Sequence, residues 1–381
     1  MSCYIIKHKR TPILSYLKNS QTVIDLALPI VKDITKNINK DDITMCYIGN
    51  VLSAGNGQNI ARQIAYKCGI KCPSITLNRV CSSGMQAIIE GYKSIVLGDY
   101  DLILVGGVES MSNSPHLIYN KKQTKYGDII IKDSMLVDGL IDSFSNELMV
   151  KQAENILKKY NLTRAELDNS AKHSYLKSRA AVSQNDFKDE ILPININNII
   201  IDEDQEINKI SNLEKIYTVK TIKEEGLLTP VTVAKLSDGA SFFLLASEKY
   251  ITKMKITPIA EIFGYNLYVD IPKNSPICFI NCIKKLCNKY NITIEDIDSF
   301  EINEAFSFMS ILANKILNIP LDNLNEYGSS ISMGHPIGAS GARIVNTLLS
   351  VLKNKSKTIG CATVCNGGGG ASSILIKNLT S

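Results

Sequence analysis

The sequence predicts an α/β protein built from two similar halves, with a long insertion in the first half. Apolar strands alternate with helices, which is the pattern of layered α/β units joined by right-handed crossovers. One strand–helix design occurs twice, since residues 43–50 resemble residues 297–303. Cys81 and His335 follow at nearly the same offset, and each precedes a helix rich in small residues. A nearly constant offset indicates an internal duplication.

The expected elements follow from runs of apolar residues and from the glycines that end them. In chain order they are strands at 43–50 and 74–80, a helix at 82–96, a strand at 101–105, a strand at 297–303, a helix at 337–352 and a strand at 359–364. The strand at 101–105 is apolar at each position from Leu102 to Val105. Such a strand suits a sheet that is covered on both faces.

A long central segment fits neither copy of the repeat. Thr163 and Glu166 form the pattern of a capping box, which predicts that a helix begins there. We expect this segment to be a loop domain laid over the first half. The predicted boundaries are 1–115 and 236–256 for the N-terminal half, 116–235 for the insertion and 257–381 for the C-terminal half.

Composition excludes several classes of protein. The 381 residues are 45% hydrophobic and 21% charged, and the formal net charge of +5 gives little reason to expect a nucleic-acid partner. No apolar run approaches the ~18 residues that span a bilayer, and the basic start has no secretory apolar region. The ten cysteines are scattered, without a zinc or disulfide pattern. We therefore expect a reduced, cytoplasmic protein without membrane or metal partners.

Cys81 is the first candidate for chemistry. It directly follows the predicted strand at 74–80 and precedes the helix at 82–96. A thiol at a helix N-terminus meets unpaired N–H groups and the positive end of the helix dipole, so we expect its thiolate to be favoured. That is the requirement for a nucleophile that accepts an acyl group. Position alone fits a buried structural cysteine equally well.

Three more residues occupy strand ends or helix starts. His335 stands in a glycine-rich turn, where a histidine is often structural. Asn303 ends an apolar strand and is also suited to cap the next helix. Cys365 directly follows the predicted strand at 359–364, and a run of glycines begins two residues later. Two cysteines, a histidine and an asparagine at such positions suit acyl transfer followed by carbanion chemistry.

Four segments together resemble the signature of the thiolase family. They are residues 77–88 around Cys81, Asn303-Glu304-Ala305-Phe306, the Gly-His-Pro segment at 334–341, and Cys365-Asn366-Gly367-Gly368-Gly369. The likeness extends over nearly the whole chain. It implies an α/β fold of duplicated βαβαβαββ halves in five layers. It also implies that the inserted loop domain covers coenzyme A and helps to assemble an oligomer.

The resemblance assigns a role to each catalytic residue. Cys81 takes the acyl group, and His335 first accepts the proton of that thiol and then donates to the thioester oxygen of the second substrate. Asn303 holds a water that, with His335, forms an oxyanion hole for the acetyl-CoA enolate. Cys365 removes the α-proton. The N–H groups of Gly367 and Cys81 form a second oxyanion hole.

The predicted substrate-binding residues depart in part from the family pattern. They are Leu148, Met149, Ala234, Gly338, Ala305 and Phe306. Many acetoacetyl-type thiolases carry a histidine that contacts coenzyme A where this chain has Leu148, and a serine that holds the pantetheine where it has Ala234. Residues 268–276 also lack the Met-Gly-Gly-Pro type of turn. These departures leave the preferred acyl chain length open.

The resemblance predicts an acetyl-CoA C-acetyltransferase with a ping-pong mechanism, acting on acetyl-CoA, acyl-CoA and free coenzyme A. It implies no metal or prosthetic group, and a homodimer or homotetramer. One alternative is a longer-chain 3-ketoacyl-CoA thiolase. A ketoacyl synthase-type enzyme is a second alternative, disfavoured because decarboxylating relatives lack the cysteine at position 365. The third is a weakly active scaffold subunit, disfavoured by the intact Cys81, Asn303, His335 and Cys365.

Overall fold

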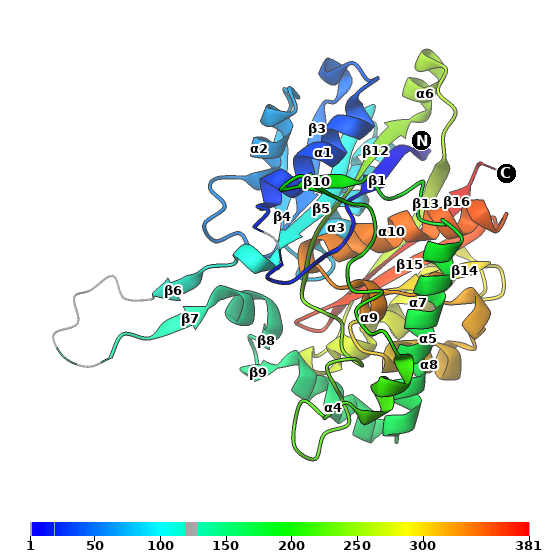
Figure 1. Ribbon diagram of the computed structural model, residues 1–381. Coiled ribbons are helices and arrows are strands. Elements are labelled where there is room, and N and C mark those ends of the chain that lie inside the picture. Colours follow the sequence, from blue (N-terminus) through cyan, green and yellow to red (C-terminus); the bar gives the residue numbers. More distant parts are fainter. Residues whose placement is uncertain (1, 19, 119–125, 127, 381) are drawn as a thin grey trace.

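The computed structural model describes residues 2–18, 20–118, 126 and 128–380. Its centre is a 10-stranded sheet (Figure 1). Nine of its strands follow the order β14-β15-β16-β13-β1-β12-β5-β3-β4, and the tenth, β2, pairs with β12. The sheet strands are β1 (Cys3–Arg10), β2 (Leu14–Ser15), β3 (Met45–Gly49), β4 (Ser74–Leu77), β5 (Leu102–Ser110), β12 (Ser237–Ser247), β13 (Ala260–Val269), β14 (Ser299–Ile302), β15 (Ile359–Asn366) and β16 (Gly370–Asn378).

The two ends of this sheet repeat one arrangement. In the first half β3 is parallel to β5, β5 is antiparallel to β12, and β12 is antiparallel to β1. In the second half β14, β15, β16 and β13 pair in the same order and with the same directions. The halves join where β1 pairs with β13 between Cys3–Ile5 and Ala260–Ile262. The predicted duplication is therefore confirmed.

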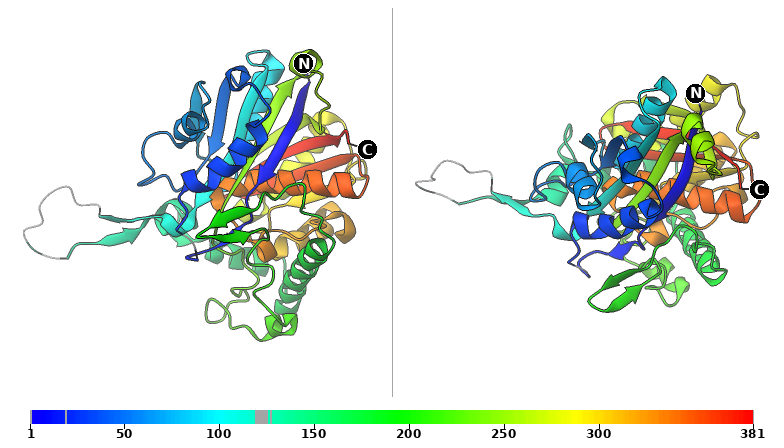
Figure 2. Two further views of the ribbon diagram at one scale, coloured as in Figure 1. Left: turned by 45° about the horizontal axis from the view of Figure 1, so that its top comes forward. Right: turned by 90° about the horizontal axis from the view of Figure 1, so that it is seen from above.

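Three layers of helices alternate with the two halves of the sheet, so the fold has five layers. One outer layer holds α1 (Val23–Thr35) and α2 (Ile60–Lys67), and the other holds α7 (Cys278–Tyr290) and α8 (Phe308–Leu317). Between the two sheet regions lie α3 (Ser83–Leu97) and α10 (Ile337–Asn354), which pack against each other (Figures 1 and 2). This arrangement confirms the predicted fold class.

Small residues allow α3 and α10 to cross closely. A Cβ atom added at Gly84 of α3 would lie 2.9 Å from the Gly338 carbonyl oxygen, and one added at Gly107 of β5 would lie 2.3 Å from the same oxygen. Glycine is required at both positions because no larger side chain fits this approach. The close crossing places Cys81, just before α3, and His335, just before α10, at the same level between the halves.

Among its described residues, the insertion contains three antiparallel pairs of short strands and two α-helices, besides short 3-10 and π-helical turns. Its elements are β6 (His116–Ile118), β7 (Ile131–Asp133), β8 (Ile141–Asp142), β9 (Glu147–Leu148), α4 (Met149–Lys159), α5 (Arg164–Ser183), β10 (Ile194–Ile196) and β11 (Ile199–Ile201). The predicted capping box is present, because Thr163 and Glu166 bond reciprocally at the start of α5. The hairpin β6–β7 projects away from both halves (Figure 2).

The expectation that the whole insertion lies over the first half is wrong. α4 packs in one apolar cluster with α7 and α8, and α5 contacts α8 and the short helix α9 (Ser330–Met333). Both helices therefore cover the second half. A later part of the insertion does bind the first half, where the fully buried Arg10 of β1 forms ion pairs with Glu190 and Asp204, each at 2.7 Å. The sequence alone did not indicate against which half of the protein α4 and α5 would pack.

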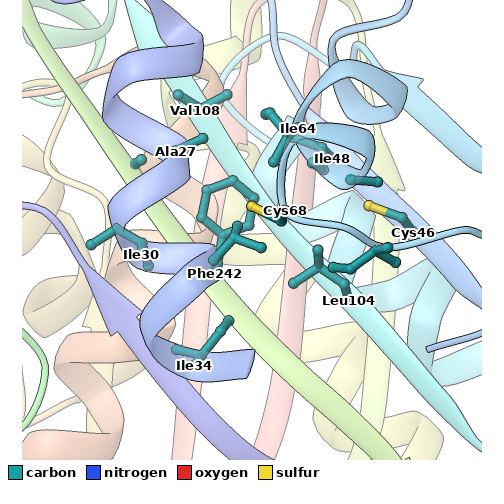
Figure 3. Packing of buried hydrophobic residues seen from close by; sticks show 14 of the residues in the cluster. Ala27, Ile30, Ile34, Cys46, Ile48, Ile64, Cys68, Leu104, Val108 and Phe242 are labelled. Carbon is teal, nitrogen blue, oxygen red and sulfur yellow. The ribbon is translucent and has the colours of Figure 1, made fainter. Parts of the chain in front are cut away.

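The outer core of the first half is closely packed and apolar. Figure 3 shows Ala27, Ile30 and Ile34 of α1 lying near Phe242 of β12, which is completely buried. The helix that follows β12, α6 (Glu248–Met254), adds Tyr250 to this cluster.

All ten cysteines are free thiols. In the part of the chain that the structure describes, no helix has the length and apolar composition needed to cross a membrane.

Candidate active site

A cavity of about 260 Å³ opens between the two halves and the insertion. Cys81 lines it from the first half, and His335 and Cys365 line it from the second. Most of the remaining wall is apolar. The other lining residues used below are Leu148, Met149, Val233, Ala234, Lys235, Ser275, Ala305, Phe306, Asn366 and Gly367. The duplication thus brings together three residues that are far apart in the sequence.

Cys81 follows a strained turn. The preceding Val80 has φ = 48°, a conformation that is unusual for a β-branched residue and costs about 1–3 kcal/mol. Hydrogen bonds on both sides of its backbone hold it there: its N–H donates to Asn78 Oδ1 at 2.9 Å, and its carbonyl oxygen accepts from Ser83 Oγ at 2.6 Å. The turn presents the Cys81 side chain to the cavity.

The resting thiol of Cys81 is protonated. Burial raises its pKa to about 12, although the backbone N–H groups of Gly367 and of Cys81 itself point at the sulfur and partly offset that effect. The raised pKa differs from the expectation that the helix N-terminus favours the thiolate, because desolvation by burial outweighs the hydrogen bonds of these N–H groups. A nucleophilic Cys81 needs a base that removes its proton.

His335 lines the same cavity. Its Nδ1 lies 2.6 Å from Ser340 Oγ, and its backbone N–H donates to the Lys235 carbonyl oxygen at 2.8 Å. Burial, together with the positive charge of Arg343, lowers the pKa of His335 to about 3. The imidazole is therefore neutral at physiological pH and able to accept a proton.

Cys365 lies near the end of β15, and Gly367 lies on the loop that follows this strand. Asn366, between them, accepts a hydrogen bond from Ser82 Oγ at 2.9 Å and donates to the Gly367 carbonyl oxygen at 2.8 Å. This bridge connects the residue after Cys81 to the loop that carries Gly367. Burial raises the pKa of the Cys365 thiol well above its usual range, and the nearby Cys81 adds to the effect. The two thiols therefore disfavour simultaneous ionisation.

Asn303 is fully buried and is not among the residues that line the cavity. Its Oδ1 accepts a hydrogen bond from Ser330 Oγ at 2.6 Å, whereas its Nδ2 has no partner among the described residues. Ala305 and Phe306, two and three residues further on, line the cavity. The resemblance implies an indirect contact of Asn303 through water, and a buried amide donor without a partner among the described residues is compatible with that role.

The predicted substrate-binding residues divide into two groups. Leu148, Met149 and Ala234 line the cavity together with Ala305 and Phe306. Gly338 does not belong with them. Its N–H donates to the buried Glu109 carboxylate at 2.9 Å, and an added Cβ would lie 2.9 Å from the Asn50 Cα. Its prediction as a substrate-binding residue is corrected: Gly338 is a packing position.

Comparison with known proteins decides the family. A family model described as the thiolase N-terminal domain matches residues 3–249, and one described as the thiolase C-terminal domain matches residues 256–378. The chain belongs to the thiolase family.

Relatives of this thiolase share its full length. Acetyl-CoA acetyltransferase IA of Candida tropicalis is 38% identical, covering 99% of this chain and 97% of that relative. The mitochondrial acetyl-CoA acetyltransferase of Homo sapiens is 36% identical, covering 98% and 90%. A crystal structure of Acat5 thiolase from Ascaris suum in complex with coenzyme A superposes with a TM-score of 0.95 at 35% identity, covering 100% of both chains.

Sequence reasoning missed several residues that arrange this thiolase site. Ser340 contacts the imidazole of His335, Asn366 accepts a hydrogen bond from Ser82, and the hydroxyl of Ser275 accepts from the Gly369 N–H at 2.7 Å. Ser340 and Asn366 stand within the quoted motifs, so their polar side chains beside glycines were the available signal. No local signal marks Ser275, which reaches the site from a 3-10 turn at Pro272–Ile277.

Proposed function

We propose that this thiolase is an acetyl-CoA C-acetyltransferase. It condenses two molecules of acetyl-CoA to acetoacetyl-CoA and, in reverse, cleaves acetoacetyl-CoA with free coenzyme A. The observation that supports this most strongly is the pair of thiols, Cys81 and Cys365, which line one apolar cavity beside the neutral imidazole of His335. Full-length relatives that are named acetyl-CoA acetyltransferases support the same activity.

The first half-reaction transfers an acetyl group to Cys81. His335 accepts the thiol proton, and the sulfur attacks the thioester carbon of acetyl-CoA. The N–H groups of Gly367 and Cys81, which point at the sulfur, stabilise the oxyanion of the tetrahedral intermediate. The coenzyme A sulfur leaves with a proton from Cys365. This step yields a neutral thioester on Cys81, a thiolate on Cys365 and an imidazolium at His335.

The second half-reaction forms the carbon–carbon bond. Acylation removes the thiol whose proximity raised the pKa of Cys365, so the Cys365 thiolate becomes less unfavourable. That thiolate takes an α-proton from a second acetyl-CoA. His335 and a water held by Asn303 stabilise the enolate oxygen, and the enolate carbon attacks the thioester on Cys81. The Cys81 sulfur leaves and regains its proton from His335.

A longer-chain 3-ketoacyl-CoA is a second candidate substrate. Leu148, which is 43% exposed, and Met149 both line the cavity and add to its apolar wall. An apolar wall favours an alkyl chain over the bare acetyl group. Thiolysis assays on acetoacetyl-CoA and on a medium-chain ketoacyl-CoA test both candidates, because activity on neither substrate would contradict the proposed function.

The remaining proposals concern cofactors, assembly and location. Thiols and hydrogen-bond donors supply the chemistry of both half-reactions, so we infer that catalysis needs neither a metal nor a prosthetic group. Dialysis against a chelator should leave turnover unchanged. We also propose a cytoplasmic homodimer or homotetramer, to be tested by cell fractionation and by light scattering of the purified enzyme.

A further inference from the structure

Asn303, Ser330 and Arg343 form a buried chain of hydrogen bonds beside the cavity. Arg343 Nη2 donates to Ser330 Oγ at 2.7 Å, and Ser330 Oγ donates to Asn303 Oδ1 at 2.6 Å. All three side chains are fully buried. The short helix α9 begins at Ser330 and leads through Gly334 to His335.

The direction of this chain is fixed by its chemistry. A guanidinium group only donates hydrogen bonds, so the Ser330 oxygen accepts from Arg343. The single hydroxyl proton of Ser330 is then directed to Asn303. The atom of Asn303 that faces Ser330 must therefore be its oxygen, and its NH₂ group is turned away from Ser330.

That NH₂ group is the part of Asn303 that remains available. Asn303 Nδ2 has no partner among the described residues, although leaving a buried donor unpaired is costly. The segment that follows Asn303 reaches the cavity with Ala305 and Phe306. A free, oriented donor at this position is suited to a water or a substrate oxygen.

We propose that Ser330 is a positioning residue for the enolate-forming step. It holds the Asn303 amide with Nδ2 free to donate and transmits the polarising charge of Arg343 to that donor. This inference rests on the proposed function, because the donor acts on the enolate of acetyl-CoA. Hydrogen bonds to charged groups are stronger than neutral ones, and a polarised chain strengthens its last donor.

Ser329 offers a matched control. Its hydroxyl is also fully buried and also lies near Arg343 Nη2, at 3.4 Å, but it donates to the Ile302 carbonyl oxygen, and within the described residues it forms no hydrogen bond with Asn303. Removing this hydroxyl perturbs the same buried region without releasing the amide. Ser329→Ala should therefore keep the parent rates.

The experiment compares Ser330→Ala, Ser330→Cys and Ser329→Ala with the parent enzyme. Three quantities are measured: acetylation of Cys81 by acetyl-CoA, exchange of the acetyl α-protons in deuterated water, and condensation. In Ser330→Ala, exchange and condensation should fall about ten- to a hundred-fold, whereas acetylation stays within about two-fold. Ser330→Cys, which keeps a weak donor, should give intermediate rates.

A double-mutant cycle separates positioning from a general structural defect. If Ser330 acts through Asn303, adding Ser330→Ala to Asn303→Ala should cause no further loss of α-proton exchange. Parental exchange in Ser330→Ala, an equal fall in acetylation, or a further loss in the double variant would overturn the assignment of Ser330. A parent enzyme that neither exchanges nor condenses would instead contradict the proposed function.

Discussion

The Nδ1 atom of His335 and the hydroxyl of Ser340 lie 2.6 Å apart, and the same hydroxyl donates to the Pro336 carbonyl oxygen at 2.8 Å. Because a serine has one hydroxyl proton, Ser340 can only accept from His335. The Nδ1 atom therefore carries the proton of the neutral ring, and Nε2 has a free lone pair. This is the tautomer that the proposed mechanism requires of His335, which there accepts the proton of Cys81.

Loss of the Ser340 hydroxyl should lower the rates of both half-reactions. The hydrogen bond that selects the tautomer contributes ~0.5–1.5 kcal/mol, so Ser340→Ala should reduce acetylation and condensation each by about two- to ten-fold. Single-turnover release of coenzyme A and steady-state condensation measure the two steps. Ser350→Ala is the control, since Ser350 is a buried serine of the same helix that bonds to Glu190. Parental rates in Ser340→Ala would show that the contact does not select the tautomer.

The rate of acetylation should be flat between pH 5 and pH 8. His335, with a pKa of about 3, remains neutral throughout this range, and Cys81, with a pKa of about 12, remains a thiol. Protonation would inactivate the base only as the pH falls toward 3. Acetyl-pantetheine is the substrate for this measurement, because it lacks the titrating phosphates of coenzyme A. A loss of rate centred near pH 6.5 would contradict a neutral, desolvated His335.

The acetyl group should be found on Cys81. Incubation with acetyl-CoA followed by peptide mass mapping is expected to label the peptide that contains this residue, because the Gly367 and Cys81 N–H groups point at its sulfur. Cys81→Ala should abolish that label. Labelling of a different cysteine while Cys81 stays unmodified would contradict the assignment of Cys81 as the nucleophile.

Leu148 should influence the preferred chain length. We expect a higher KM for acetoacetyl-CoA than for a medium-chain ketoacyl-CoA, and Leu148→His should narrow the difference by about two- to ten-fold, the effect of one net hydrogen bond. Leu176→His is the control, because Leu176 is a similarly exposed leucine at 47% on α5, outside the cavity. Equal constants for the two substrates, unchanged by either variant, would show that Leu148 has no influence.

The fold and the cavity residues were predictable because their signals are local. A cysteine before a glycine-rich helix and a histidine in a Gly-His-Pro turn can be read from a few neighbours, and the duplication then implies that they meet. Properties that depend on burial were not predictable: the helix N-terminus predicted a favoured Cys81 thiolate, whereas desolvation raises its pKa to about 12. Contacts between distant segments, such as Ser330 with Asn303, also left no mark in the sequence.

The most direct test of the two-thiol mechanism is α-proton exchange of acetyl-CoA in deuterated water by the Cys365→Ala variant. Cys361→Ala is the control, since Cys361 is a buried cysteine of the same strand that does not line the described cavity. We expect Cys365→Ala to become acetylated on Cys81, more slowly than the parent because the departing coenzyme A sulfur loses its proton donor. Exchange should fall by about 10²- to 10⁴-fold, the usual contribution of a general base. Parental exchange in Cys365→Ala would contradict the role of Cys365 as the base.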